Sequence, residues 1–380
     1  MRKGKTIAAA AAIGGLALTA GCSSSPGSGG SASSASLAKA AKATSAASFG
    51  GMSGLIAAAK KEGQLNVITL PANWANYGTI MKDFTKKYGI KITDANPDGT
   101  SQDEINAMKQ LKGQSRAPDV LDMGTSFAIG ADQQHLLAPY KVASWGQIAA
   151  NAKAPDATWY DDYGGYVAIG YDPARVKVPP TSFADLSKPM YKNMVALNGS
   201  PTEAGAAFAG VYAAALANGG SFANIAPGIA YYAKLHKLGN FVPLTGSPST
   251  VQSGQTPILV WWDYLLASEV QPVVKGFKIV IPSDGHYAAY YSQAISATAP
   301  HPAAARLWEE YLYSVTGQNL WLQGKARPIE LPSLISGNTI DKPAYQALPA
   351  APSGSLTFPS QQQLSAAQQA LAQQWASKVG

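Results

Sequence analysis

Short apolar runs alternate with amphipathic segments through most of this sequence, and this alternation constrains the fold more than any other feature. Residues 65–70 have the pattern of a strand, which Pro71 ends, and residues 77–88 then carry apolar side chains at helical spacing. The strand pattern returns at 90–93 and 118–123, with a helical pattern between them. This β-α-β-α-β order predicts an α/β fold with a parallel sheet, helices on both faces and right-handed crossovers.

The second half of the chain repeats this pattern and predicts a second lobe. Its expected strands lie at 194–197, 241–244, 256–262 and 277–281. Two further strands, at 165–171 and 290–295, stand where the chain would pass between the lobes. We therefore expect the division that follows: residues 53–171 and 286–380 in lobe 1, and residues 172–285 in lobe 2.

The apolar strand at 256–262 ends in side chains that can bind a ligand. Trp261 and Trp262 are followed by Asp263 and Tyr264. Ligands of open α/β sheets bind at the carboxyl ends of strands, so this strand end is a candidate site. Because adjacent strand residues face opposite ways, one indole should belong to the core. We predict that Trp262 and Asp263 face the ligand.

The N-terminus predicts export. A basic start and an apolar run at 6–20, too short for a membrane span, predict a signal peptide over residues 1–22. Cys22, the one cysteine, follows Leu-Thr-Ala-Gly, which resembles the lipobox of bacterial lipoproteins. The Ser/Gly/Ala-rich stretch after it predicts a flexible tether over residues 23–52. We expect a lipid anchor at Cys22, on the outer face of the cell membrane or on the periplasmic side in a two-membrane cell.

Charge and motifs exclude several classes of function. The formal charge of +7 falls to +4 without Arg2, Lys3 and Lys5, and no basic run is interleaved with aromatics, so we expect no nucleic-acid partner. The four histidines have no metal-site spacing, and neither a metal nor a cofactor is expected. Asp161 or Asp162 with Asp263 is the pair for an alternative, a secreted glycoside hydrolase. Because Gly-x-Ser-x-Gly, His-Glu-x-x-His and P-loop motifs are absent, we predict a binding protein and not an enzyme.

Four segments resemble one known family, the extracytoplasmic solute-binding proteins of ABC importers, in the branch with ferric-ion, polyamine and 2-aminoethylphosphonate binders. The segments are 57–65, 118–122, 178–186 and 303–318. The resemblance implies a type II periplasmic-binding-protein fold, with two α/β lobes, two interlobe crossing strands and a ligand cleft that closes by hinge motion. It also implies a monomer that serves a membrane permease and its ATPase.

The loop at 73–77 resembles the Asn-Trp-x-x-Tyr loop of spermidine and putrescine binders, where aromatic faces hold alkyl stems and ammonium groups. A cation over an indole gains about 0.5 to 2 kcal/mol, and Asp263 would neutralise it. We therefore expect a small amine-bearing solute such as a polyamine, with 2-aminoethylphosphonate or ferric ion as alternatives. Ferric binders carry a Tyr-Tyr pair where this chain has Trp262 and Asp263, which disfavours iron.

Two helix starts add possible hydrogen-bond donors. Ser200 has the position of a helix N-cap with Thr202 beside it, and Thr125 and Ser126 stand at another helix start, where an anionic group is also stabilised. One ring of Tyr290 and Tyr291 is expected to reach the cleft. The predicted ligand-binding set is Trp74, Tyr77, Thr125, Ser126, Asp161, Ser200, Thr202, Trp262, Asp263 and Tyr290.

Overall fold

The structure is a computed structural model that describes residues 32–352 and 358–380. The predicted signal peptide, Cys22 with its expected lipid anchor and residues 23–31 of the predicted tether lie outside the described residues. The described part of the predicted tether includes a helix, α1 (Ser34–Ala41). Across the two described ranges, no helix combines the length and the apolar character needed to cross a membrane.

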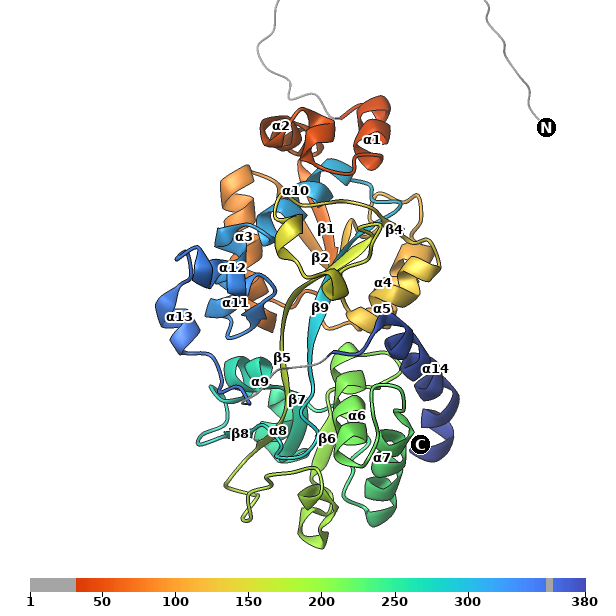
Figure 1. Cartoon of the computed structure of the whole chain (residues 1–380), viewed down its shortest axis with the longest axis vertical. Coiled ribbons are helices and arrows are strands. Elements are labelled where there is room, and N and C mark those ends of the chain that lie inside the picture. The colour runs from red at the N-terminus through yellow and green to blue at the C-terminus, as the bar shows by residue number, and fades with distance from the viewer. Residues whose placement is uncertain (1–31, 353–357) are drawn as a thin grey trace, which may run out of the picture. The chain divides into compact units, whose positions relative to one another are not determined.

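Lobe 1 is an α/β unit. β1 (Gln64–Ile68) pairs in parallel with β2 (Lys91–Ala95), and β3 (Val120–Gly124) pairs antiparallel with β9 (Ala288–Ser296). Helices surround these strands (Figure 1). These helices are α2 (Met52–Glu62), α3 (Tyr77–Tyr88), α4 (Ser101–Gln110), α5 (Thr125–Gln133), α10 (Pro302–Leu312) and α11 (Val315–Gln323). Helix α3 buries one apolar stripe, formed by Tyr77, Ile80, Phe84 and Tyr88, whereas α10 is buried along its whole length.

Lobe 2 follows the same plan around a smaller sheet. β6 (Val195–Leu197) and β7 (Ile258–Trp262) are parallel. Helix α6 (Gly205–Ala217) is apolar on all sides and is buried from Gly205 to Ala215, as expected of an interior helix. The other elements of this lobe are α7 (Ala226–Leu238), α8 (Pro248–Ser253), α9 (Asp263–Leu265), the π-helical turn Leu266–Val270 and β8 (Lys278–Val280).

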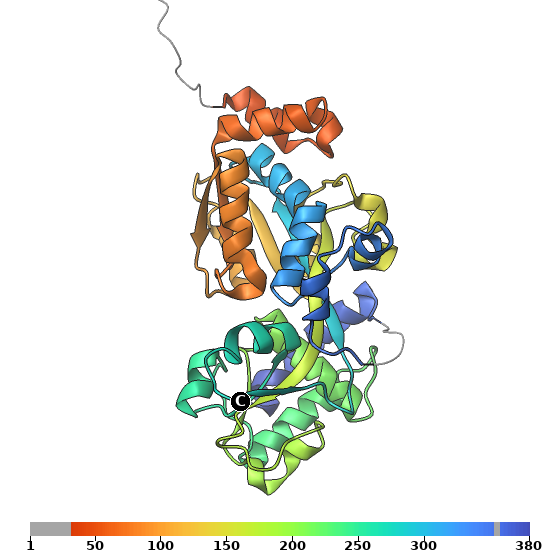
Figure 2. The same cartoon turned by 90° about the vertical axis from the view of Figure 1, so that its left-hand side faces the viewer.

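Two strands cross between the lobes. β5 (Trp159–Tyr171) pairs with β9 through its first half and with β7 and β8 through its second half, and every residue of β5 is buried. Figure 2 shows the crossing from the side. The sheet order β3-β9-β5-β7-β6 is therefore mixed, although the sequence predicts a parallel sheet. The crossing strands run antiparallel to their neighbours, and only the β1–β2 and β6–β7 pairs are parallel among the described strands.

The C-terminal helix α14 (Gln361–Lys378) contacts both lobes. On lobe 1, Ser126 Oγ of α5 donates to Gln368 Oε1 at 3.2 Å. On lobe 2, the Trp375 ring lies 5.7 Å from that of Tyr232, between ring centroids. The helix therefore spans the junction that β5 and β9 also cross. Three short helices lie elsewhere, namely α1 (Ser34–Ala41), α12 (Leu331–Ser336) and α13 (Lys342–Gln346), together with the two-residue strands β4 (Leu137–Ala138) and β10 (Arg327–Pro328).

Candidate functional site

A cleft of about 550 Å³ lies between the two lobes. Lobe 1 contributes the loops that follow β1 and β2 and the end of β3, and lobe 2 contributes the loop between β6 and α6 and the end of β7. These are carboxyl ends of strands, where an open α/β sheet presents loops and helix N-termini to a ligand.

Three aromatic rings from three different elements line the cleft. Trp74 comes from the loop after β1, and its ring centroid lies 5.9 Å from that of Trp261 in β7 and 5.5 Å from that of Tyr291 in β9. The indole nitrogen of Trp74 donates to the hydroxyl of Tyr163 at 2.7 Å, which fixes the ring. The loop reaches this position through Ala75 and Asn76, whose φ angles of 43° and 72° turn the chain sharply before α3 begins.

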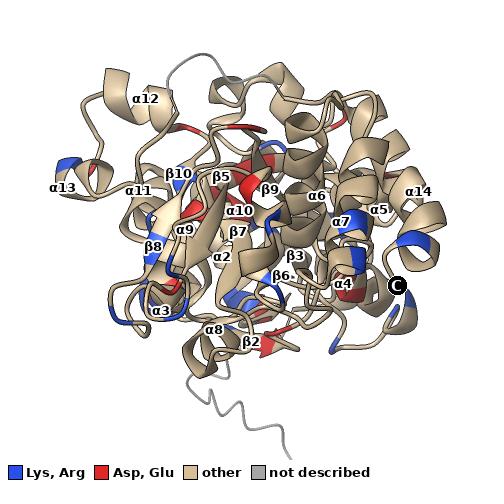
Figure 3. Ribbon diagram, turned by 90° about the horizontal axis from the view of Figure 1, so that it is seen from below, with Lys and Arg blue, Asp and Glu red and all other residues tan. Residues whose placement is uncertain are grey.

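The charged residues that line the cleft are all acidic. No lysine, arginine or histidine is among its described lining residues. Figure 3 also shows acidic (red) ribbon segments near the labels of β5, β9 and α10, at the centre of the view. The acidic lining residues are Asp98, Glu104, Asp122, Glu203 and Glu269.

Burial acts on three of these carboxyl groups. It raises the pKa of Asp122 and of Glu269 to about 7, and it raises the pKa of Glu104 well above its ordinary value. Asp122 Oδ1 and Glu269 Oε1 are both buried without a hydrogen-bond partner among the described residues. A buried polar atom without a partner is costly, so these two oxygens favour a ligand that brings hydrogen-bond donors or positive charge.

Asp122 and Glu269 are held from opposite lobes. Asp122 Oδ2 accepts from the hydroxyls of Tyr77 (2.8 Å) and Tyr163 (2.7 Å) in lobe 1. Glu269 Oε2 in lobe 2 accepts from Asn73 Nδ2 in lobe 1 at 2.9 Å. The Asn73–Glu269 hydrogen bond thus joins the two lobes across the cleft.

The start of α6 also borders the cleft. Gly205 and Ala206 line it, and no side chain caps the helix at Ala204. The first N–H groups of an uncapped helix are available to an anionic group. The start of α6 packs closely against the start of α5. A Cβ atom added to Gly124 would lie only 2.9 Å from the Cα of Gly205, which is too close for a side chain. This close approach requires glycine at both positions.

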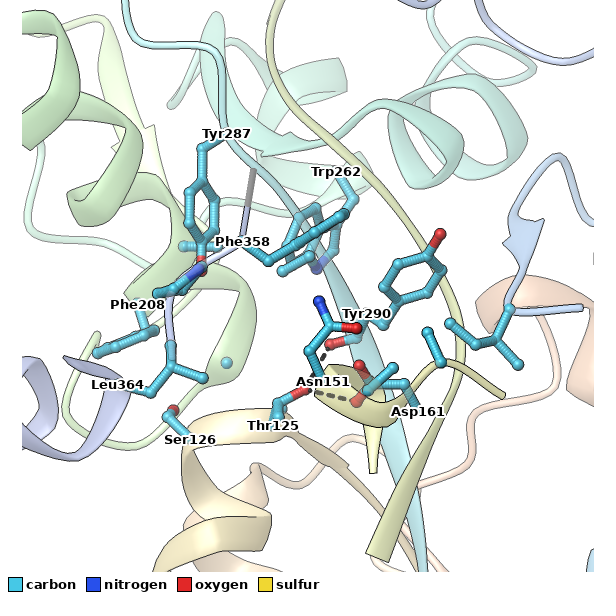
Figure 4. A pocket seen from close by; sticks show the side chains of 18 of the residues that line it. Thr125, Ser126, Asn151, Asp161, Phe208, Trp262, Tyr287, Tyr290, Phe358 and Leu364 are labelled. Carbon is cyan, nitrogen blue, oxygen red and sulfur yellow. Dashed lines mark hydrogen bonds between the residues drawn. The ribbon is translucent and has the colours of Figure 1, made fainter. Parts of the chain in front are cut away.

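A second cavity, of about 240 Å³, lies on the other side of the β7 and β9 strands. Trp262 and Tyr290 line it, whereas their neighbours Trp261 and Tyr291 line the cleft, as strand alternation requires. Figure 4 shows Trp262, Tyr290 and Phe358 around the space. Its other labelled lining residues are Thr125, Ser126, Asn151, Asp161, Phe208, Tyr287 and Leu364.

The residues predicted from sequence fall into three groups. Trp74 and Ser200 line the cleft. Tyr77, Thr202 and Asp263 line neither cavity, since Tyr77 and Asp263 are fully buried and Thr202 faces the hydroxyl of Ser200 at 2.8 Å. The remaining predicted residues line the second cavity, namely Thr125, Ser126, Asp161, Trp262 and Tyr290.

Asp263 has partners inside the protein. Its Oδ2 accepts from Arg327 at 2.7 Å and its Oδ1 accepts from the backbone N–H of Tyr166 at 2.9 Å. The positive charge that we expected from a ligand is therefore supplied by Arg327. Asp162, from the hydrolase alternative, is likewise occupied, because Gln293 Nε2 donates to it at 2.9 Å.

Sequence reasoning missed most of the cleft. Two of the missed residues do carry a sequence signal. Trp261 is the neighbour of Trp262 at the end of one predicted strand, and Asp122 stands near the end of another. No sequence signal marks Glu269, which the π-helical turn at Leu266–Val270 brings to the cleft. Within the described ranges, no cluster of three or more His, Cys, Asp or Glu side chains is arranged to hold a metal ion.

Comparison with known proteins places this geometry in a family. Residues 115–349, more than half of the chain, match the family described as bacterial extracellular solute-binding protein. None of the curated proteins matches the sequence.

Solved structures share the fold at low sequence identity. The periplasmic binding protein AfuA from Actinobacillus pleuropneumoniae, with exogenous fructose-6-phosphate bound, has a TM-score of 0.68 and 18% identity, over 84% of this chain and 99% of its own. A ferric binding protein from Campylobacter jejuni has a TM-score of 0.62 and 17% identity, over 83% and 99%. A putative spermidine/putrescine ABC transporter from Listeria monocytogenes has a TM-score of 0.57 and 12% identity, over 75% and 88%.

These neighbours confirm the type II periplasmic-binding-protein fold that the sequence predicts. The family match confirms a binding protein and overturns the hydrolase alternative. The chain belongs to the bacterial extracellular solute-binding proteins and is not an enzyme.

Proposed function

We propose that this protein captures a small amine-bearing solute, such as a polyamine, and delivers it to an ABC permease and its ATPase for import. The observation that carries this proposal is the charge of the cleft, whose charged lining residues are all carboxylates. A bound ammonium group would neutralise carboxylates that the described residues leave without a positive partner.

The aromatic rings support the same class of ligand. Trp74, Trp261 and Tyr291 offer a surface for alkyl segments, and a cation over an indole gains about 0.5 to 2 kcal/mol. Asp122 and Glu269 each keep one buried oxygen without a partner, one on each lobe. A diamine would reach both lobes at once, and a ligand that contacts both lobes stabilises the closed arrangement.

A zwitterion such as 2-aminoethylphosphonate is the second candidate. The specific observation in its favour is the uncapped start of α6 at Gly205 and Ala206, which also borders the cleft. Free N–H groups at a helix start bind phosphate and phosphonate oxygens, while the carboxylates would hold the amine.

A ligand screen on the protein without residues 1–22 tests the proposal. We expect putrescine or spermidine to raise the melting temperature, because a ligand at 100 times its Kd stabilises the native state by about 2.7 kcal/mol. We also expect one ligand molecule to bind per protein molecule. Aminoethylphosphonate, thiamine and ferric citrate complete the panel. Binding of ferric citrate alone would contradict an amine ligand.

Two tryptophan variants provide a matched control for this screen. Trp74→Ala removes a ring from the cleft and should weaken the amine ligand by roughly tenfold or more. Trp145→Ala removes a ring that packs on Tyr160 at 5.4 Å and lines neither cavity, so it should leave the affinity unchanged. Equal losses in the two variants would count against the cleft.

We also propose that the protein is a lipoprotein anchored through Cys22. Replacing Cys22 with alanine should move the protein from the membrane fraction to the soluble fraction, because the acyl chains supply the attachment. Solute binding should not change. Membrane association that persists in this variant would contradict the anchor.

A further inference from the structure

The second cavity is built from three separate parts of the chain. Lobe 1 supplies Thr125 and Asp161, lobe 2 supplies Phe208 and Trp262, and Phe358 closes the space from the segment before α14. Phe358 lies beyond residue 349, where the family match ends. The cavity therefore combines residues inside the family match with a residue outside it. Gly124 and Gly205, at the closely approaching starts of α5 and α6, line this cavity, and Gly205 also lines the cleft.

Aromatic side chains supply most of its wall. Trp262, Tyr290 and Phe358 surround the space in Figure 4, with Tyr287 and Phe208 next to them. The ring centroids of Tyr290 and Phe358 are 5.8 Å apart, so the C-terminal segment packs directly on the crossing strand. Rings from several directions around one space make a site that favours organic cations, because each ring face carries negative electrostatic potential.

Asp161 is the one charged side chain among the described residues that line this cavity. It is 7% exposed, and its Oδ1 accepts from Thr125 Oγ1 at 3.0 Å and from Ser292 Oγ at 2.7 Å. No described residue donates a hydrogen bond to its Oδ2, and burial raises the pKa of this carboxyl to about 7. Asp161 therefore faces the aromatic space without a counter-charge among the described lining residues, whereas Asp263 is paired with Arg327.

We propose that this cavity is a second binding site, separate from the solute cleft, which takes a small organic ammonium ion. The ammonium would lie beside Asp161 and against the rings of Trp262 and Tyr290. A cavity of 150 Å³ is known to hold benzene, so about 240 Å³ suits a molecule of roughly seven to ten non-hydrogen atoms. Because both lobes and the residues Phe358 and Pro359 form the walls, an occupant favours the arrangement in which all three are together.

Choline is a suitable probe, since it is compact, permanently charged and of this size. We expect isothermal titration of the purified protein with choline to show one site, and Asp161→Asn to weaken it about tenfold or more. Asn keeps the shape and the ability to accept from Thr125 and Ser292, so this change removes the charge alone. Phe358→Ala, on the closing segment, should also weaken choline and carries little risk to the fold.

Two controls separate this site from the cleft. Glu269→Gln removes a cleft carboxylate and should leave choline binding within twofold of the unchanged protein. The neutral isostere 3,3-dimethyl-1-butanol should bind at least tenfold more weakly than choline if charge recognition matters. The proposal is overturned if choline fails to bind, if Glu269→Gln removes its binding, if neither Asp161→Asn nor Phe358→Ala weakens it, or if the neutral isostere binds equally well.

Discussion

The two sides of the β7 and β9 strands differ in charge far more than in aromatic content. On the cleft side, Trp261 and Tyr291 stand among five carboxyl groups. On the other side, their neighbours Trp262 and Tyr290 stand with the carboxyl group of Asp161, the one carboxyl group among the described residues that line this cavity. One step along each strand thus separates an acidic cleft from a mainly aromatic cavity. Aromatic residues in a strand sequence indicate a binding region, and the carboxylates around them decide which ligand each side suits.

Asp263 belongs to neither side, and removing its partner should give the largest effect. Arg327→Ala would leave a fully buried carboxylate without counter-charge, at a cost of about 3 to 5 kcal/mol in the free energy of unfolding. Urea denaturation without ligand measures this change. Ligand affinity in the folded fraction should stay the same, because Asp263 lines neither cavity.

Lys188→Ala is the matched control for that experiment. Lys188 pairs with Asp185, and both side chains reach solvent (52% and 17% exposed), so losing this pair should cost at most about 1 kcal/mol. Should Arg327→Ala leave the stability unchanged and abolish ligand binding, Asp263 would have to be counted as a cleft residue.

Glu269→Gln tests whether charge defines the cleft. Glutamine keeps the size of the side chain and its contact with Asn73, but it removes the negative charge. The affinity for an amine ligand should fall by about 1.5 to 3 kcal/mol, or roughly 10- to 150-fold, as measured by titration calorimetry.

Glu62→Gln provides a comparison with a second buried carboxyl. Burial raises the pKa of Glu62 to about 7, as it does for Glu269, but Glu62 accepts from the backbone N–H groups of Ala303 and Ala304 and lines neither the cleft nor the second cavity. Its replacement should leave amine affinity unchanged. If both variants weakened the ligand equally, the loss would reflect general destabilisation and not a local charge.

The pH dependence of binding should follow the raised pKa values of Asp122 and Glu269, both about 7. Below pH 7 these groups are largely protonated in the empty cleft, and a cation must displace the protons. Amine affinity should therefore drop about tenfold for each participating carboxyl between pH 8 and pH 6. Calorimetry at pH 6, 7 and 8 measures this slope, which should become shallower in Glu269→Gln.

The empty protein should show the opposite trend in stability. A carboxyl whose pKa is higher in the folded state than in the unfolded state stabilises the fold at low pH, and this contribution is lost as pH rises through the folded pKa. Asp122 and Glu269 should therefore make the ligand-free melting temperature decrease between about pH 4 and pH 8.

A pH-independent amine affinity would show that neither group is protonated in the empty cleft.

The sequence predicts the architecture well because periodicity and strand ends are local properties. The two lobes, the crossing strands and the binding family are confirmed. The segment 241–244 is a wrong prediction, since only Phe241 forms a bridge there, to Val195. Short apolar runs next to an edge strand have the right composition for a strand whether or not they continue the hydrogen-bond ladder.

The site is harder to predict because it depends on long-range geometry. Trp261 and Trp262 are indistinguishable until the pairing register of β7 with β5 is known, and a shift by one residue would exchange them. Asp263 has the sequence position of a ligand residue, but Arg327 lies 64 positions later and takes its charge. Which of the predicted residues contact a ligand stays a prediction, to be tested by the variants above.

Asn73→Ala should give the smallest effect, and it tests how strongly the two lobes are held together. Asn73 donates to Glu269 at 2.9 Å in an exposed position, and a hydrogen bond of this kind contributes about 0.5 to 1.5 kcal/mol. Removing it should favour opening of the lobes and weaken an amine ligand by roughly two- to tenfold. Calorimetry measures the affinity, and small-angle X-ray scattering without ligand should give a larger radius of gyration.

Asn319→Ala is the control, because Asn319 donates to the carbonyls of Val315 and Thr339 within lobe 1. It should change neither the affinity nor the radius of gyration. Tighter amine binding in Asn73→Ala would mean that Asn73 competes with the ligand for Glu269 more than it holds the lobes together. In that case the hydrogen bond from Asn73 would reduce the affinity of the acidic cleft for amines. The cleft and the second cavity would then differ in their affinity for cations by more than the number of carboxyl groups on each side suggests.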